Sequence, residues 1–249
     1  MSGKAMAPVV HLRSAVALAG RFPALSGVDL SVDPGEVVVV LGPNGAGKTS
    51  LLRTCAGLLP VTSGQAWVLG HDLADDRTAV RRRVGLLGHA APLYDELTAV
   101  ENVRFAVRAL GLPADRVDPA LERLGLVGRL RRTTVGRLSA GQRRRVALAS
   151  LLARGPELWL LDEPHAGLDA AARHLLAELV AEAAAAGVPV LLSSHEPDLA
   201  VPLADRVVTM AGGAVTHQAR GGRRATLAAV PPTGLVPGTT ATGGSSHVA

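Results

Sequence analysis

The sequence is poor in cysteine, lysine and aromatic residues. It contains one cysteine, two lysines, two Trp, one Tyr and two Phe among 249 residues. A lone cysteine excludes an intramolecular disulfide framework. Aromatic side chains that stack on bases are nearly absent, so the net charge of +5 is not matched by the other features of a nucleic-acid surface. We attribute the charge to the 24 arginines of an Ala- and Arg-rich chain and expect no nucleic-acid partner.

Long uninterrupted apolar segments are also missing. A membrane-spanning helix needs about 18–20 apolar residues, and the longest candidate, residues 175–192, is interrupted by Glu178 and Glu182. Near the N-terminus, His11 and Arg13 interrupt the apolar residues, so the pattern of a signal peptide is not present. We therefore expect a protein of the cytosol or of the cytoplasmic face of the cell membrane.

Apolar residues make up 48% of the chain and alternate between strand-like and helix-like segments. This alternation predicts an α/β fold, with helices covering a parallel sheet that is buried on both faces. We expect helices at residues 48–58, 78–83, 140–154 and 170–186. The expected strands lie at residues 9–18, 28–32, 37–41, 66–69, 84–87, 158–161, 190–193, 206–210 and 214–217.

Two segments depart from the simple alternation. Residues 98–154 are mainly helical, with breaks near Gly111 and Gly125, and predict a helical subdomain inserted into the α/β domain. After Gln218 the composition changes to Gly, Pro, Thr and Ser. We therefore predict one domain at residues 1–218, with a small antiparallel β part at its N-terminal end, and a disordered tail at 219–249. Truncation after Gln218 is expected to leave folding intact.

The most specific motif follows the all-Val strand at 37–41 and opens a helix. It runs Gly42-Pro43-Asn44-Gly45-Ala46-Gly47-Lys48-Thr49 and matches the phosphate-binding loop, the P-loop of nucleoside triphosphatases. Glycines let backbone N–H groups approach phosphates, and the helix N-terminus favours the anion. We expect Lys48 to bind the β- and γ-phosphates, Thr49 to place its hydroxyl on Mg²⁺, and Ser50 to complete the binding loop.

Four further motifs follow this loop. They are Leu138-Ser139-Ala140-Gly141-Gln142, Leu158-Trp159-Leu160-Leu161-Asp162-Glu163-Pro164, Ala166-Gly167-Leu168-Asp169 and Ser193-Ser194-His195. In order and spacing the set resembles the ABC ATPase family over residues 9–217. The resemblance implies a P-loop fold of the ABC ATPase type, with ATP and Mg²⁺ as cofactors, a dimer or paired ATPase subunit, and an integral membrane permease as partner.

Part of the site follows from the residues themselves. Ser139 and Gln142 have the spacing of a helix capping box, which stabilises a helix in any protein. Asp162 ends a buried apolar strand, where a carboxylate is costly without a cation or hydrogen bonds, so a Mg²⁺ contact is expected.

The resemblance implies the other roles. Ser139, Gly141 and Gln142 would face the γ-phosphate of an ATP held by the other subunit. Glu163 resembles the general base that polarises the attacking water. His195 resembles the switch histidine that contacts the γ-phosphate, and Asp169 resembles the aspartate that links the two sites of the dimer.

Two positions depart from the family pattern. Alignment of nearby landmarks places Ala19 where the family has an aromatic residue that stacks on adenine, and Phe22 is a candidate substitute. His89, twelve residues before Glu101, stands where the family usually has a Gln that senses Mg²⁺ and the membrane partner. We expect His89 to take this metal-sensing position.

Two short segments are similar to one subfamily, the ATP-binding subunit of the haem exporter used in cytochrome c maturation. They comprise Gly88-His89 with residues 97–102, and residues 138–149. Haem export is therefore one hypothesis for the transported substrate, and export of another substrate is the alternative. A permease is expected to dock near residues 93–101.

Two other classes remain open at the level of sequence. A DNA-repair or ribosome-associated ABC ATPase usually carries coiled-coil insertions or two cassettes, and the sequence indicates neither. A P-loop kinase would leave the 138–142 motif without a function. The arginine runs at 81–83 and 143–145 are interpreted as solvated helix faces.

Overall fold

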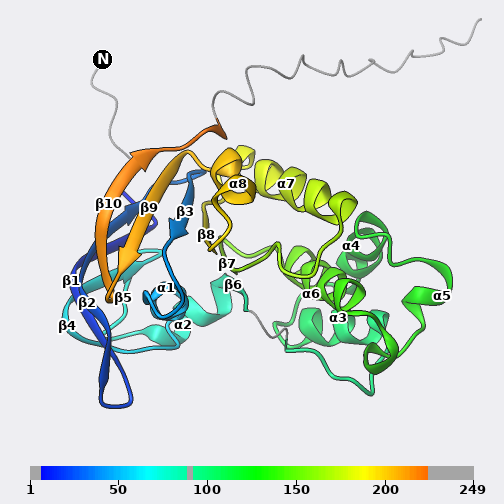
Figure 1. The fold of residues 1–249 in the computed structure, drawn as a ribbon. Coiled ribbons are helices and arrows are strands. Elements are labelled where there is room, and N and C mark those ends of the chain that lie inside the picture. Colours follow the sequence, from blue (N-terminus) through cyan, green and yellow to red (C-terminus); the bar gives the residue numbers. More distant parts are fainter. Residues whose placement is uncertain (1–6, 89–91, 224–249) are drawn as a thin grey trace, which may run out of the picture.

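The computed structural model describes residues 7–88 and 92–223, and its centre is a six-stranded sheet with the order β10-β9-β3-β8-β7-β6 (Figure 1). Strands β6 to β9 and β3 run parallel to their neighbours, and only β10 is antiparallel. The strands are β3 (Val37–Leu41), β6 (Val84–Leu87), β7 (Leu158–Asp162), β8 (Val190–Ser194), β9 (Arg206–Ala211) and β10 (Ala214–Arg220). The predicted parallel sheet is confirmed.

A second, antiparallel sheet of four strands has the order β2-β1-β4-β5 and confirms the expected N-terminal β part. Its strands are β1 (Val10–Ala19), β2 (Phe22–Val32), β4 (Val61–Val68) and β5 (His71–Asp72). Strand β2 starts six residues before the expected residue 28, because its backbone pairs with β1 as far as the contact between Ala19 and Phe22. The sequence did not predict this first half of the strand, because neither Pro23 nor Gly27 favours a strand by propensity.

Besides three short 3-10 helices, the described part of the chain also contains eight α-helices. They are α1 (Lys48–Cys55), α2 (Arg77–Arg83), α3 (Ala99–Arg108), α4 (Val117–Arg123), α5 (Gly128–Arg131), α6 (Ala140–Arg154), α7 (Ala170–Ala185) and α8 (Pro197–Ala200). Helices α3 to α6 form a separate lobe beyond β6, on the opposite side of the molecule from the antiparallel sheet (Figure 1). None of the helices in the described ranges is long and apolar enough to cross a membrane.

Strand β3 is buried on both faces, as its run of valines predicts. Val37 and Val39 belong to the core shared with α3, α4, α6 and α7. Val38 and Val40 belong to a second core with α1 and the antiparallel sheet. All four side chains are fully buried, and each such burial contributes on the order of 2 kcal/mol. The loop that follows β3 is therefore anchored from both sides.

The expected domain boundary after Gln218 is wrong, because it falls inside β10. The strand continues to Arg220, and the Gly221 N–H donates to the Asp205 carbonyl at 2.8 Å. Arg223 then pairs with the Asp205 carboxylate at 2.6 Å. Truncation after Gln218 would remove these contacts, so it is not expected to leave the folding free energy unchanged. The polar composition was misleading because β10 is an edge strand with mostly exposed side chains. Residues 224–249 of the predicted tail lie outside the described residues.

Candidate nucleotide site

Three loops meet at the carboxyl-terminal edge of the parallel sheet. They follow β3, β7 and β8, which lie side by side in the order β3-β8-β7. In parallel sheets, ligands bind outside the carboxyl ends of the strands. The loop after β3 carries the P-loop motif, the end of β7 carries Asp162 and Glu163, and the end of β8 carries Ser193 and His195.

Two glycines of the P-loop cannot be replaced without strain. Gly42 has φ 151°, and a Cβ there would lie 2.4 Å from the Met210 carbonyl oxygen. Gly47 has φ 101°, and its Cβ would lie 2.8 Å from the Ala24 carbonyl oxygen. Gly47 is also the N-cap residue of α1 and has no side chain to cap the helix. The N–H groups of the first turn are therefore available to an anion.

Lys48 is the buried cation of this cleft. Its side chain is 7% exposed, and its ammonium donates to the carbonyls of Gly42 and Pro43 at 2.7 and 3.3 Å. The ammonium also lies 3.8 Å from the Glu163 carboxylate. The cleft has a volume of about 470 Å³, enough for the phosphates of a nucleotide. Its lining includes Asn44, Gly45, Ala46, Gly47, Lys48, Thr49, Ser50, Asp162 and Glu163.

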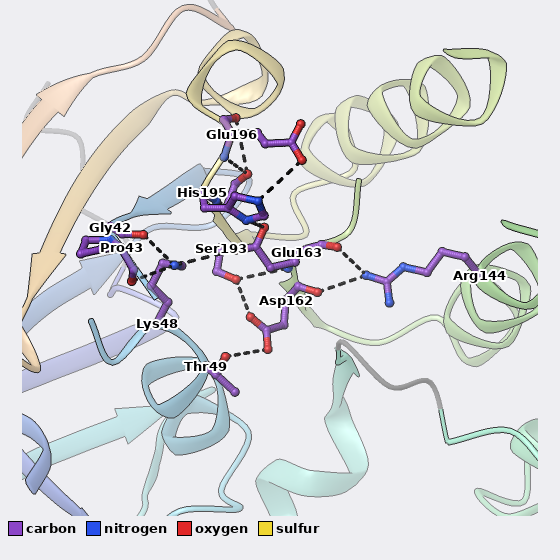
Figure 2. A network of polar contacts seen from close by, with 11 residues as sticks. Gly42, Pro43, Lys48, Thr49, Arg144, Asp162, Glu163, Ser193, His195 and Glu196 are labelled. Carbon is purple, nitrogen blue, oxygen red and sulfur yellow. Dashed lines mark hydrogen bonds and ion pairs between the residues drawn. The ribbon is translucent and has the colours of Figure 1, made fainter. Parts of the chain in front are cut away.

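Thr49 and Asp162 form an oxygen donor pair. The Thr49 hydroxyl donates to one oxygen of Asp162 at 2.8 Å, and the Ser193 hydroxyl donates to the other at 2.5 Å (Figure 2). Asp162 is 4% exposed, so these bonds offset the cost of burying its carboxylate. A hydroxyl and a carboxylate fit Mg²⁺, which prefers oxygen ligands and keeps several waters or phosphate oxygens.

No larger metal-binding cluster exists within the described ranges: no group of three or more His, Cys, Asp or Glu side chains is placed to hold an ion. A Mg²⁺ at Thr49 and Asp162 would therefore complete its ligands from phosphate and water. Sequence reasoning did not assign Ser193 a role. The feature that would have identified Ser193 is the pairing of β7 with β8, which places Ser193 opposite Asp162.

Glu163 stands between the P-loop lysine and a histidine. One carboxylate oxygen lies 2.8 Å from His195 Nδ1 and accepts the His195 backbone N–H at 3.3 Å. The other oxygen faces Lys48. The backbone of Glu163 is left-handed, with φ 47°, which costs on the order of 1–3 kcal/mol for a residue other than glycine. Backbone strain of this kind occurs where the surrounding structure holds a functional side chain in place.

The motif at 138–142 lies apart from this cleft. Ser139 caps α6, and the predicted capping box is present: the Gln142 N–H donates to the Ser139 hydroxyl at 3.2 Å, and the Ser139 N–H donates to the Gln142 amide at 3.0 Å. Neither these two residues nor Gly141 belongs to the cleft lining among the described residues. One chain therefore does not bring its own P-loop and its own 138–142 motif into one site.

Asp169 has a structural role that is visible in one chain. It caps α7 by accepting the Ala172 N–H at 2.7 Å, and its other oxygen pairs with Arg145 at 3.2 Å. The predicted link between two sites of a dimer stays a prediction.

The interpretation of residues 143–145 as a solvated helix face is wrong for Arg144. Its side chain is 6% exposed and donates to main-chain carbonyls of residues 162–164, the turn after β7 that we call the catalytic loop. Consecutive residues of an α-helix point about 100° apart, so three successive arginines cannot share one face. Arg143 and Arg145 do form exposed ion pairs, with Asp95 and Asp169.

Two predicted positions are not joined to the cleft. His89 lies outside the described residues, so its metal-sensing role stays a prediction. Phe22 is 78% exposed at the hairpin between β1 and β2, next to Pro23 and Ala24, which do line the cleft. Stacking of adenine on Phe22 stays a prediction as well.

A P-loop that faces a buried Asp162 and a partly buried Glu163 at the edge of a parallel sheet defines the class of P-loop nucleotide hydrolases. Comparison with known proteins narrows the class. A model described as "ABC transporter" matches residues 25–166, more than half of the chain. The cytochrome c biogenesis ATP-binding export protein CcmA of Aromatoleum aromaticum is 42% identical over 192 residues, which cover 76% of this chain and 89% of that protein.

Two further similarities are to an import protein and to a solved dimeric cassette. The sulfate/thiosulfate import ATP-binding protein CysA 1 of Rhizobium meliloti is 39% identical over 206 residues, 79% of this chain and 58% of that protein. A dimeric ATP-binding cassette in a post-hydrolysis state, bound to ADP and Pi, has a TM-score of 0.76 and 27% identity, covering 85% of this chain and 98% of that one. The chain belongs to the ABC transporter ATP-binding family and is an ATP hydrolase.

The buried His165 makes the free energy of unfolding depend on pH. Its side chain is 5% exposed and, in the described part of the chain, Nδ1 has no hydrogen-bond partner. Burial lowers the pKa of His165 and outweighs the nearby charges of Glu196 and Glu163, which raise it. The charges of Arg173 and Arg144 act on this pKa in the same direction as burial. The imidazole is therefore neutral in the folded chain at pH values where the unfolded chain begins to bind a proton, near pH 6.5.

This shift predicts lower stability in mild acid. Above pH 6.5 neither state is protonated at this side chain, and below it only the unfolded state gains the proton until the lower folded pKa is reached. We expect the Tm of His165→Phe to fall less than that of the parent protein between pH 7 and 5.5, by at most about 3–5 °C over this range. Thermal melts across this range measure the difference. His174→Gln, a change at an exposed histidine, is the control, and parallel slopes for His165→Phe and the parent would contradict the assignment.

Proposed function

We propose that this chain powers a separate membrane permease by hydrolysing ATP, as the nucleotide-binding subunit of a haem exporter. The observation that carries the catalytic part is the Glu163 carboxylate at the cleft, 2.8 Å from His195 and 3.8 Å from Lys48. A carboxylate beside the γ-phosphate position is placed to accept a proton from an attacking water. In a transporter of this kind, the nucleotide-binding subunit lies at the cytoplasmic face of the cell membrane.

In the proposed mechanism, residues of the chain bind the phosphates, orient the attacking water and accept its proton. Lys48 and the N–H groups that open α1 hold the β- and γ-phosphates. Thr49 and Asp162 would hold Mg²⁺, which supplies charge neutralisation at the phosphates. Glu163 orients the water and accepts its proton, while His195 holds the Glu163 carboxylate in place and contacts the γ-phosphate.

The second half of the site comes from a second ATPase subunit. Ser139, Gly141 and Gln142 begin helix α6 away from the cleft of their own chain. Their helix N-terminus favours an anion. We place the γ-phosphate of the partner's ATP there, so that two nucleotides lie between two chains. Asp169 lies close to this surface through its contact with Arg145 and connects the two sites.

The permease contact is proposed at an apolar groove of about 320 Å³ between the sheet and the helical lobe. Its lining includes Leu93, Tyr94 and Phe105. Tyr94 and Phe105 are each about half exposed and pack edge to face at 4.9 Å. The docking segment expected at residues 93–101 contributes Leu93 and Tyr94 to this groove, and aromatic side chains are enriched at protein interfaces.

Haem is the proposed cargo because the 88–89 and 138–149 segments resemble the haem-exporter subunit and a cytochrome c biogenesis protein is among the relatives at 42% identity. An exporter for another substrate is the alternative: the similarity to a sulfate/thiosulfate import protein at 39% identity favours keeping the cargo open, although it says nothing for export. The cargo contacts the membrane subunits, so residues of this chain do not select it.

A gene-deletion experiment in the source organism tests the cargo. Deletion is expected to remove covalently haem-bound c-type cytochromes, measured by haem staining of membrane and soluble fractions. The unaltered chain should restore them, whereas Glu163→Gln, expressed at the same level, should not. Normal c-type cytochromes in the deletion strain would assign the chain to another cargo without affecting its ATPase assignment.

A further inference from the structure

Arg144 reaches from the helical lobe into the catalytic loop. Its guanidinium donates to the carbonyls of Gly88 at 2.6 Å, Asp162 at 3.1 Å, Glu163 at 3.0 Å and Pro164 at 3.4 Å. Figure 2 shows the side chain approaching Asp162 and Glu163 from the side opposite Lys48. One side chain of α6 therefore holds the end of β6 and the whole turn after β7.

These contacts replace the usual partner of a buried cation. Arg144 forms no ion pair among the described residues, and burial lowers its pKa, although the Asp162 charge acts against this effect. The planar guanidinium carries five N–H donors and makes four hydrogen bonds to main-chain carbonyls instead. Such a match depends on the direction of each carbonyl, so it holds the backbone of the loop in one arrangement.

The backbone conformation that Arg144 stabilises is strained at Glu163. Glu163 has φ 47°, in the left-handed region that disfavours residues with a side chain. Its N–H is bonded on one side to the carbonyl and hydroxyl of Ser193, each at 3.2 Å. Its carbonyl is bonded on the other side to Arg144. The peptide groups flanking the Glu163 Cα are thus fixed from two elements, and the carboxylate direction follows from them.

We infer that Arg144 is a positioning residue, which sets the Glu163 carboxylate and couples it to the helix that begins at Ser139. Arg144 lies five residues after Ser139 on the rigid helix α6. A movement of α6 when Ser139 meets the partner's nucleotide is transmitted to the Glu163 backbone through the guanidinium. The inference rests on the proposed role of Glu163 as general base.

The test compares Arg144→Met with Arg144→Lys and with a matched control on the same helix. Arg154 has a partly buried guanidinium and donates to a main-chain carbonyl, that of Val84 at 3.1 Å, but it does not contact the catalytic loop. Arg154→Met therefore removes a partly buried cation from the same helix. Steady-state ATPase activity, ATP affinity and Tm are measured for each purified full-length variant.

Arg144→Met is expected to lower kcat about 10- to 100-fold, because it misplaces the base, while KM and the Kd for ATP change by less than about threefold. Arg144→Lys, which retains the charge and some donors, should recover part of kcat. Arg154→Met should lower Tm to a similar extent but keep kcat within about twofold. Adding Arg144→Met to Glu163→Gln should cause no further loss of turnover, because the base is already absent.

Two results would overturn the inference. The first is a kcat of Arg144→Met within about twofold of the parent protein. The second is a loss of kcat in both Arg144→Met and Arg154→Met that is proportional to their loss of Tm. If Arg144→Met does not fold, Arg144→Gln, which keeps two donors, is measured by the same criteria. Turnover by Glu163→Gln itself would instead refute the base assignment, so the two failures are distinguishable.

Discussion

Glu163→Gln is expected to bind ATP but to lose nearly all hydrolysis. The amide keeps the size of the carboxylate and cannot accept the proton of the attacking water, which typically costs about 10²–10⁴-fold in kcat. Lys48, Thr49 and Asp162 are unchanged, so the Kd for ATP should stay within about threefold. Because ATP is no longer consumed, it should hold two chains together, and light scattering coupled to size-exclusion chromatography should detect an ATP-dependent dimer.

The neighbouring acid offers a control for this result. Glu196 lies 3.9 Å from the other side of His195 and is about half exposed. Glu196→Gln removes one negative charge near the same histidine without altering the cleft. It should retain turnover within a few-fold of the parent. Near-normal hydrolysis by Glu163→Gln would show that another group takes the proton.

A mixed dimer should recover activity that neither of its parents has. In a dimer of one Lys48→Ala chain and one Ser139→Arg chain, one site contains both changes and the other contains neither. The heterodimer should reach at most about half of the parental turnover, because one of two sites is intact. Each mutant homodimer should be nearly inactive, because both of its sites carry a change.

Two different affinity tags allow purification of this heterodimer in sequence, followed by an ATPase assay at equal protein concentration. The control is a heterodimer in which both changes lie on the same chain, paired with an unaltered chain. That dimer has a defect in each site and should be nearly inactive, although its composition is the same. Equal activity in the two heterodimers would contradict a site shared between subunits.

Local chemistry made much of the fold predictable. Strand β3 and helix α6 occupy the expected ranges, because an all-Val run bounded by turns and a capping box followed by an apolar helix are strong local signals. The P-loop was predictable for the same reason: its glycines, lysine and threonine lie within eight consecutive residues. The structure brings Lys48, Thr49, Asp162, Glu163 and His195 into one place, as their motifs predict.

Edge elements were predicted less well. Strand β2 was expected to be too short, and β10 was cut at Gln218 although it runs to Arg220. The missed parts, residues 22–27 and 219–220, have mostly exposed side chains and therefore carry little apolar pattern. Pairing with a neighbouring strand stabilised them instead, and that pairing is not encoded locally.

The sequence by itself determined the nature of the chemistry: a P-loop, an acidic pair after a buried strand and a histidine after the next strand, each recognisable from a few adjacent residues. Only the tertiary structure decided how these groups support one another. Ser193 bonds Asp162 because β7 and β8 are neighbours, and Arg144 bonds the Glu163 carbonyl because α6 packs behind the catalytic loop. Both contacts join residues about twenty to thirty positions apart, and a hydrogen bond to a backbone carbonyl leaves no pattern in the partner's side chains.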